Sequence, residues 1–302
     1  MTLAKVKDVE SRRERIGLPS YIFLALWSIF ILAPFYWLVL MSIKEPQDWY
    51  AHPPKFFVTQ PFWDNYLVIF NPYQLSIRGA LWYEDVAMAA IKPVADSLVI
   101  GAAASAIALT VGLMAAIAVS RYRFGRELFP FGVLTVSIFP PIILVVPLII
   151  LFENTGLLDS YLSLILVYGG LTTPFAMWIT RGFINSVPKE LEEAAMVDGM
   201  SRFAAPFRIT LPVIKGAIAA TFLFLLLLNM GEFMISLSLT YSNVITVPVQ
   251  LSKYVLVEAG TLYGAQAALS LVILIPILIT TIVIRRYLVA GVSFGAVRGR
   301  TA

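Results

Sequence analysis

Long apolar runs alternate with shorter polar segments along almost the whole chain. Six of the runs are long enough to cross the roughly 30 Å of hydrocarbon in a bilayer. They lie at about residues 20–41, 97–119, 128–152, 161–180, 213–237 and 264–287. The runs lack the ten-residue alternation of a membrane β-barrel, so we predict an all-α membrane protein with six transmembrane helices. Prolines at positions 140, 141 and 147 in the third run and 276 in the sixth predict kinks, which a helical bundle can accommodate.

The polar segments divide the chain into tails, loops and a core. We expect an N-terminal tail at residues 1–19, a first span at 20–41, a long outer loop at 42–96, a core of five spans at 97–287 and a C-terminal tail at 288–302. The outer loop is rich in proline, tryptophan and tyrosine, and loops of that length usually carry structure and function. Because the N-terminal tail is polar and leads into a run of spanning length, we expect no cleavable signal peptide.

Composition and charge agree with this topology. The chain is 59% hydrophobic and 13% charged, whereas soluble domains carry about 25% charged residues. The two tails and the loops after the second and fourth spans contain 17 of the 22 lysines and arginines, which by the positive-inside rule places both termini in the cytoplasm. The net charge of +4 therefore reflects topology, and we expect no nucleic-acid partner. There are no cysteines, and the single histidine, His52, has no apparent ligand partner, so we expect no metal site.

The loop at residues 181–212 contains a short acidic helix between two spans. Pro188 suits a first helical turn, acidic residues crowd the N-terminal half where the helix dipole favours anions, and Gly199 suits a left-handed residue that ends a helix. A helix of about ten residues is marginal in water and needs a docking partner. It is either a knob for a complementary groove or a membrane-surface connector between two spans.

The spacing of this loop resembles the signature loop of ABC importer permease subunits, in the form EAA-x3-G-x9-I-x-L-P. The flanking segments SRYRFGR (120–126), PLIILFENTGLLDSYLSLIL (147–166) and TTPFAMWITRGFINSVPKELEEAAMVDG (172–199) resemble the binding-protein-dependent carbohydrate branch, the MalG-like family. The resemblance covers roughly residues 64–290. The motif residues are Glu193, Ala194, Ala195, Gly199, Ile209, Leu211 and Pro212, with Asp198 beside them.

The resemblance implies a type I ABC importer transmembrane domain (MetI-like) with a cytoplasmic coupling helix, in the bacterial cytoplasmic (inner) membrane. Its implied partners are a second homologous permease subunit, two cytoplasmic ATP-binding subunits that each dock one coupling helix, and an extracytoplasmic solute-binding protein. ATP and Mg would be bound by those ATPase subunits. The chain has no GxxxxGK[ST] sequence, so we expect it to bind no cofactor and to be no enzyme by itself.

Polar residues inside spans are the default candidates for a substrate pathway. Asn229 and Glu232 lie three residues apart in the fifth run, so we expect them to share one helix face, with Phe233 beside them. Glu232 is alternatively an interfacial carboxylate satisfied by a neighbouring helix. The family usually has a Trp-Asn-Glu-Phe-like run here, and Met230 and Gly231 replace the Trp and Asn. Weaker candidates, whose hydroxyls often only bond helix carbonyls, are Thr172 and Thr173, together with Trp178, Ser137 and Phe139.

We therefore predict the permease subunit of an ATP-driven importer for a sugar, a polyol or a sugar conjugate. One alternative is an ABC permease for another solute, such as an amino acid or phosphate. An ion-coupled carrier acting alone is another, but it predicts intramembrane acid or histidine relays and Glu232 is the only clear mid-chain acid. A membrane enzyme is disfavoured because no paired carboxylates, HExxH motif or nucleophile–base set stands out.

Overall fold

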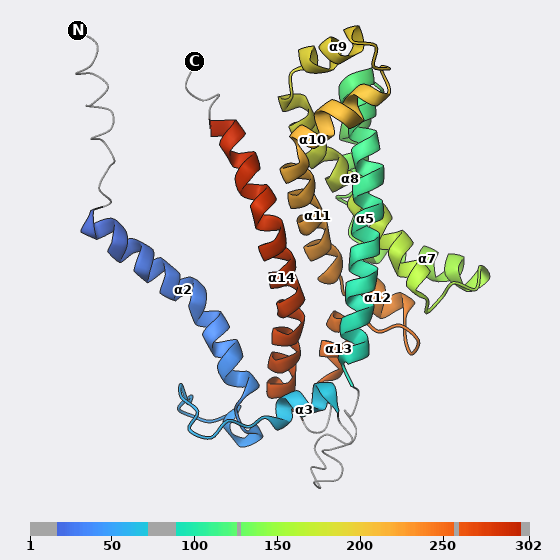
Figure 1. Ribbon diagram of the computed structural model, residues 1–302. Helices are drawn as coiled ribbons and strands as arrows, with labels where there is room; N and C mark the ends of the chain where they lie inside the picture. Colours follow the sequence, from blue (N-terminus) through green and yellow to red (C-terminus); the bar gives the residue numbers. More distant parts are fainter. Residues whose placement is uncertain (1–16, 72–88, 126–127, 257–259, 297–302) are drawn as a thin grey trace.

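A bundle of long helices forms the centre of the computed structural model, which describes residues 17–71, 89–125, 128–256 and 260–296. Its helices are α5 (Ile91–Tyr122), α8 (Tyr161–Ser186), α11 (Lys215–Met230) and α14 (Tyr263–Ala296). Helix α5 packs along α8 and α11, and α11 also packs on α14 (Figure 1). Most of the expected N-terminal tail, part of the outer loop and the last six residues lie outside the described residues.

Helices α5 and α8 approach each other closely at a glycine. A Cβ added to Gly112 would lie 2.5 Å from the Cβ of Ala176 and 2.7 Å from the backbone nitrogen of Met177. Real side chains never approach that closely, so only glycine permits this crossing. Small residues at helix crossings are the usual way in which membrane helices bring their backbones together.

The six predicted spans are not confirmed in number. Four of the described helices are long and apolar enough to cross a membrane: α2 (Leu18–Ser42), α5, α8 and α14. A fifth is counted if α11 and the preceding segment Pro206–Val213, which meet at 74°, form one bent span. Helix α14 also continues to Ala296, so the predicted C-terminal tail from residue 288 begins as helix.

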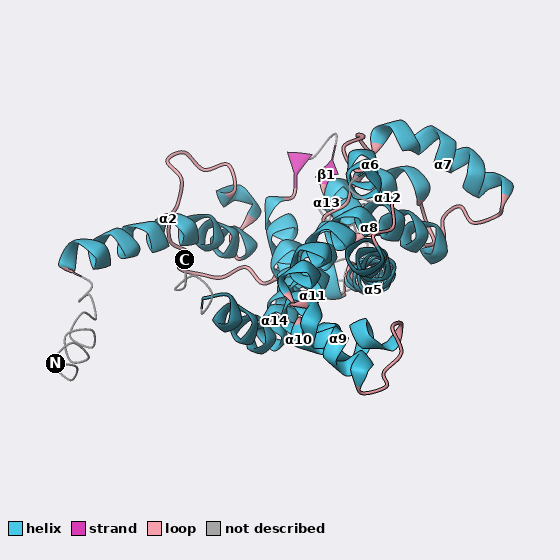
Figure 2. Ribbon diagram, turned by 90° about the horizontal axis from the view of Figure 1, so that it is seen from above, coloured by secondary structure: helices cyan, strands magenta, loops and turns pink. Residues whose placement is uncertain are grey.

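The third predicted span is two short helices instead of one kinked helix. Helix α6 covers Leu128–Val136 and α7 covers Ile142–Asn154. The pair Pro140–Pro141 lies between them, and two adjacent prolines remove two backbone donors and force the preceding residue out of helical geometry. Viewed along the bundle, α7 and α2 extend away from it in different directions (Figure 2).

The fifth predicted span also ends early. Helix α11 stops at Met230, and a separate helix α12 (Met234–Leu239) follows. The Glu232 carboxylate accepts hydrogen bonds from the backbone N–H groups of Ile235 at 2.9 Å and Ser236 at 3.2 Å. Asn229 and Glu232 therefore do not share one helix face, because Glu232 caps the start of the next helix.

Shorter elements complete the described chain. The outer loop holds the 3-10 turn η1 (Pro46–Asp48) and helix α3 (Asp64–Phe70), and it ends where α5 begins at Ile91. Helix α13 (Val247–Lys253) precedes a small antiparallel hairpin of β1 (Val255–Leu256) and β2 (Gly260–Thr261). Helix α3 and α13 lie at the end of the bundle opposite to helix α9 (Lys189–Val197) (Figure 1).

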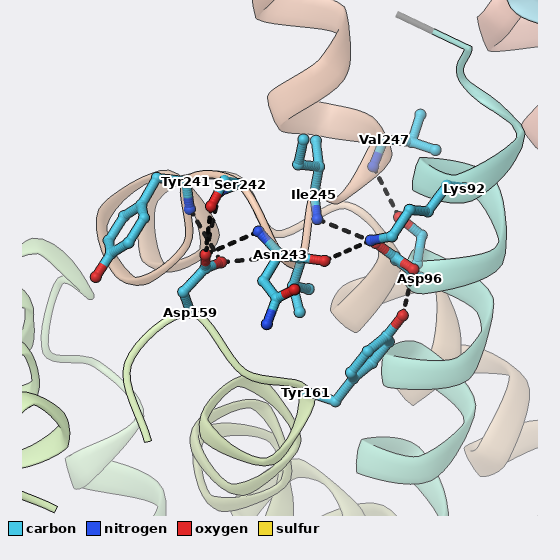
Figure 3. A network of polar contacts seen from close by, with 11 residues as sticks. Lys92, Asp96, Asp159, Tyr161, Tyr241, Ser242, Asn243, Ile245 and Val247 are labelled. Atoms are coloured by element: carbon cyan, nitrogen blue, oxygen red, sulfur yellow. Dashed lines mark hydrogen bonds and ion pairs between the residues drawn. The ribbon is translucent and has the colours of Figure 1, made fainter. Parts of the chain in front are cut away.

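Two buried aspartates fasten the loop between α12 and α13 to the bundle (Figure 3). Asp159, just before α8, accepts the backbone N–H groups of residues 241–244 at 2.8–3.2 Å. Asp96 of α5 accepts from Lys92, from the Tyr161 hydroxyl at 2.6 Å and from the Ile245 N–H at 3.1 Å. The loop thus uses charge-assisted hydrogen bonds where it has no regular structure of its own.

Candidate functional site

The short acidic helix predicted in the loop 181–212 is α9. It covers nine residues, Lys189–Val197, and Gly199, whose φ of +93° is left-handed, follows at the C′ position. The Gly199 N–H donates to the Met196 carbonyl at 3.1 Å. The Met200 N–H donates to the Ala195 carbonyl at 3.0 Å. This pair of bonds is a Schellman motif, so the predicted role of Gly199 as the left-handed end of the helix is confirmed.

One face of α9 is turned away from the rest of the chain. It mixes three carboxylates with apolar side chains, and Val197 is 88% exposed. Ala195 is half-buried at the edge of this face. The exposed residues are Glu190, Leu191, Glu193, Ala194, Val197, Asp198 and Gly199. These exposed acidic and apolar side chains are available for contact with another chain or with the membrane surface.

The opposite face of α9 is fixed by a buried ion pair. The Arg121 Nε at the end of α5 donates to Oε1 of Glu192 at 2.7 Å, and the two side chains are 5% and 8% exposed. The hydroxyl of Thr210, in the π-helical turn η3 (Pro206–Thr210), donates to the same carboxylate oxygen. A second guanidinium nitrogen of Arg121 donates to two backbone carbonyls at the end of α8, those of Ile184 and Val187.

This Arg121 cluster joins four elements: α5, the end of α8, α9 and η3. A buried charge is tolerated only when its partners satisfy it, so the cluster specifies one position of α9 on the bundle. Below it, Ile117, Met177 and Ile214 belong to one apolar core between α5, α8 and the foot of α11.

The chain after α9 is also tied to α5. The Tyr122 hydroxyl donates to the Arg202 carbonyl at 3.0 Å, and the Tyr122 ring stacks on Phe203 at 5.6 Å between centroids. The Arg202 guanidinium lies over the same ring at 5.2 Å. A cleft of about 360 Å³ opens between this segment and α9, lined by Arg121, Tyr122, Lys189, Glu192, Glu193, Met196, Arg202 and Pro206.

The second half of the sequence motif supports the bend into α11. Ile209 is half-buried at the end of η3. Leu211 and Pro212 form the single turn α10 (Leu211–Val213), where Leu211 is half-buried and Pro212 exposed. These residues position the bend and are not part of the exposed face of α9.

Sequence reasoning missed Arg121, Glu192 and Thr210. By sequence, Arg121 counts as a topology charge, and Glu192 as one of the charges around the exposed helix. The helical period places Glu192 on the same side of α9 as Ala195 and Met196, but Lys189 lies on that side too, so charge alone does not mark it as the buried one. The partner 71 residues away carries no local signal.

The predicted pathway residues on α8 and α11 make contacts inside the bundle. Asn229 is buried and its Nδ2 donates to the Ser105 hydroxyl of α5 at 2.9 Å. The Thr172 and Thr173 hydroxyls donate to the carbonyls of Tyr168 and Gly169, each at 2.7 Å. The contacts of the two threonines are thus those of ordinary helix hydroxyls.

The remaining pathway candidates are more exposed. Phe233 is half-buried next to Glu232 at the start of α12, and Ser137 is half-buried. Trp178 is 43% exposed, with the Arg181 guanidinium 5.8 Å from its ring centroid. Phe139 is 58% exposed, between α6 and α7. The buried candidates thus hydrogen-bond to residues that were not predicted to line the pathway, and Trp178 contacts Arg181, which was not predicted there either.

No metal centre is evident in the described part of the chain, where no three histidine, cysteine, aspartate or glutamate side chains gather.

The chain is similar to several known transport proteins. It is 30% identical over 276 residues to the trehalose/maltose transport system permease protein MalG of Thermococcus litoralis, covering 91% of this chain and 94% of that protein. It is 30% identical over 291 residues to the inner membrane ABC transporter permease protein YcjP of Escherichia coli K12, covering 94% and 97%. Both likenesses therefore extend over nearly the whole of each protein.

A solved structure shares the fold. The crystal structure of a bacterial ABC transporter involved in the import of the acidic polysaccharide alginate contains a chain that matches with a TM-score of 0.66 at 19% identity, covering 91% of this chain and 98% of that one. Residues 108–293, which include α9, its anchor and the bent approach to α11, match the family described as binding-protein-dependent transport system inner membrane component. The chain therefore belongs to this family of ABC importer permeases, whose ATPase is a separate subunit.

Proposed function

We propose that the chain forms half of the translocation pathway of an ATP-driven importer for a sugar, a polyol or a sugar conjugate. The observation that carries the coupling role is the exposed, mixed acidic and apolar face of α9 held on a buried anchor. The solute class rests on the name of the trehalose/maltose permease, to which the chain is 30% identical. An importer that worked without an ATPase would have no use for an exposed helix held in one position.

The proposed coupling runs from an ATP-binding subunit through α9 into the bundle. Glu193, Ala194, Ala195, Asp198 and Gly199 form the contact with that subunit. Two ATP-binding subunits, carrying ATP and Mg, would each hold one such helix, one from this chain and one from the second permease. When the ATPase subunits close, the displacement of α9 reaches α5 through Arg121 and reaches α11 through the bent segment ending at Val213.

The other proposed partners follow from the rest of the surface. Helix α2 packs on α14 and otherwise extends away from the bundle with its apolar side chains exposed, which suits contact with lipid and with the second permease (Figure 1). With α9 and both termini on the cytoplasmic side, α3, α13 and the hairpin lie on the outer side. An extracytoplasmic solute-binding protein would meet the chain there.

Substitution of Gly199 tests the coupling proposal. The φ of +93° strongly disfavours a β-branched residue, so Gly199→Val should distort the end of α9. We expect ATP-driven uptake to be lost and the ATP-binding subunit to copurify poorly. Gly182→Val is the matched control, because a Cβ there meets nothing within 4 Å. If uptake and copurification both survive in Gly199→Val, α9 is not the coupling contact.

A panel of solutes tests the substrate class. The complete transporter, reconstituted with its binding protein, would be offered a disaccharide, a polyol, an amino acid and inorganic phosphate, each labelled. Uptake of the disaccharide or the polyol is expected. Uptake of the amino acid or phosphate alone would instead support a permease for a non-carbohydrate solute.

A further inference from the structure

A second cleft, of about 300 Å³, is lined by residues at the end of α2 and the start of α14. These two helix ends lie at the opposite end of the bundle from α9 (Figure 1). Its exposed lining residues include Tyr50, His52 and Pro54, and its buried ones are Met41 and Lys44. The lysine is only 1% exposed, although lysine is among the residues least often buried. The cleft is therefore entered from solvent past exposed side chains and has a cationic inner wall.

The backbone around Lys44 is held in place. The Asn65 side-chain amide of α3 donates to the Lys44 carbonyl at 2.9 Å, and the Trp49 indole N–H donates to the same carbonyl at 3.3 Å. The ammonium itself lies 4.3 Å from the centroid of the Trp37 ring. Within the described part of the chain, no hydrogen bond or ion pair reaches that ammonium.

Asp48, the carboxylate among the lining residues, is already engaged. Its Oδ1 lies 2.5 Å from the Nζ of Lys55. Burial lowers the pKa of Lys44, the charge of Asp48 opposes this, and the charge of Lys55 adds to it. The Lys44 ammonium thus faces one aromatic ring and a carboxylate that is shared with Lys55, so a further anion entering the cleft would be attracted to it.

The position of the cleft indicates which anion is suitable. Helix α2 ends at Ser42 and α14 begins at Tyr263, so the cleft lies at the level where two apolar helices leave the hydrocarbon. Its walls include the aromatic rings of Trp37, Trp49, Tyr50 and Tyr263. Tryptophan and tyrosine gather at the headgroup level of a bilayer. The anions abundant at that depth are phosphates, for which a lysine is a common point-charge ligand.

We propose that this cleft is a phosphate-binding site in which Lys44 is the cationic ligand. The phosphate belongs either to an anionic lipid headgroup or to a free phosphate ion. The site is independent of the transport function proposed above and lies at the opposite end of the bundle from α9. The competing explanation is that Lys44 only neutralises the carbonyl end of α2 and binds nothing.

The test uses the full chain in its assembled transporter, reconstituted in phosphatidylcholine nanodiscs. One arm titrates phosphatidylglycerol into the discs, and the other titrates inorganic phosphate into the buffer. The readouts are phosphate or lipid adducts in native mass spectra and the thermal unfolding midpoint. Lys44→Met keeps the length of the side chain over Trp37 and should weaken binding about tenfold or more, since hydrogen bonds to charged groups contribute about 1.5–3 kcal/mol.

Two further variants make the result decisive. Lys215→Met removes an exposed lysine, changes the net charge equally and should leave binding unchanged. Asp48→Asn removes the carboxylate of the cleft and should tighten phosphate binding. If Lys44→Met loses binding of phosphatidylglycerol, the site takes a lipid headgroup. If it loses binding of inorganic phosphate, the site takes the free ion. The proposal is overturned if Lys44→Met and Lys215→Met behave alike in both arms, or, should Lys44→Met fail to assemble, if Asp48→Asn binds no more tightly than the unmodified chain.

Discussion

One carboxylate oxygen, Oε1 of Glu192, accepts hydrogen bonds that tie α9 to the elements beneath it. It accepts from Arg121 and from Thr210, so residues from α5, α9 and η3 converge on a single atom. Removing one partner from such a cluster leaves a buried charge without compensation. This destabilises a protein far more than replacing both partners by apolar residues. The position of α9 therefore depends on Arg121, a residue outside the sequence motif.

Arg121→Met should destabilise the folded protein by about 3–5 kcal/mol, because Glu192 stays buried with only Thr210 as a partner. Thermal unfolding of the purified transporter and protease cleavage near residue 200 would measure the effect. Arg208→Met removes an exposed arginine from the same segment and is the control. The double variant with Glu192→Met should recover much of the loss, and equal unfolding midpoints for Arg121→Met and Arg208→Met would refute the anchoring role.

Asp159 gives the loop at residues 240–247 a pH dependence. Burial raises the pKa of its carboxyl, but the four backbone N–H donors outweigh burial and hold the pKa below its ordinary value. The stabilisation is therefore complete above about pH 4, the ordinary aspartate value, and is lost as the pH falls from there through the lower folded pKa.

Asp159→Asn should remove this stabilisation at neutral pH, at a cost of about 1.5–3 kcal/mol. Asparagine tolerates the φ of +54° at this position, so the backbone is preserved. Hydrogen exchange of the amides of Tyr241, Asn243 and Val244 is the measurement, with Glu153→Gln, an exposed acid nearby, as the control. Unchanged protection of these amides in Asp159→Asn would show that the carboxylate does not hold the loop.

For single residues, the sequence shows which side chains are charged or polar but not which hydrogen-bond partners they have in the fold. Glu232 was predicted to share a pathway face with Asn229, yet it caps α12, and Asn229 bonds Ser105 across 124 positions. Gly199 was predictable because its role depends only on local backbone geometry. Partners fixed by tertiary packing leave no trace in neighbouring residues.

At the scale of elements, the crossing of α5 and α8 leaves no room for a side chain at Gly112. Gly112→Val places a branched side chain where Ala176 already lies 2.5 Å from the Cβ position, so it should destabilise the bundle by at least about 1–3 kcal/mol and lower the amount of folded protein in the membrane. Gly170→Val on α8 meets nothing within 4 Å and should be close to neutral. Equal yields and unfolding midpoints for the two variants would contradict the close crossing.

The apolar runs predicted where helices lie, but not where they break. Length and hydropathy suffice for α2, α5, α8 and α14, since the bilayer sets the length of any spanning helix. Pro140 and Pro141 were expected to kink one helix and instead separate two. Helix α11 ends before Gly231, a residue type that often follows a helix end, inside a run that hydropathy alone continues to residue 237.

For the whole molecule, the orientation in the membrane is open to a direct test. The chain has no cysteine, so single-cysteine variants can be labelled without background. Gln47→Cys in the outer loop should react with a membrane-impermeant maleimide on intact spheroplasts, whereas Ser201→Cys beyond α9 should react only after permeabilisation. Both positions are exposed in the structure. The reverse pattern would invert the proposed topology.

The family could be identified from the sequence because the motif from Glu193 to Pro212 has characteristic residues at a fixed spacing, which can be read along one short segment. The assembly could not be derived in the same way. The faces of α2 and α9 that are proposed to meet other chains are simply exposed in the single chain, and from the sequence they cannot be told apart from lipid-facing or solvent-facing helix surfaces.

The 74° bend between Pro206–Val213 and α11 has a mechanical consequence. If α9 is displaced as proposed above, the displacement would reach α11 through a segment inclined to it by 74° and would reach the end of α5 directly through Arg121. The two helices would then be moved along different directions, which would turn one against the other rather than shift both together.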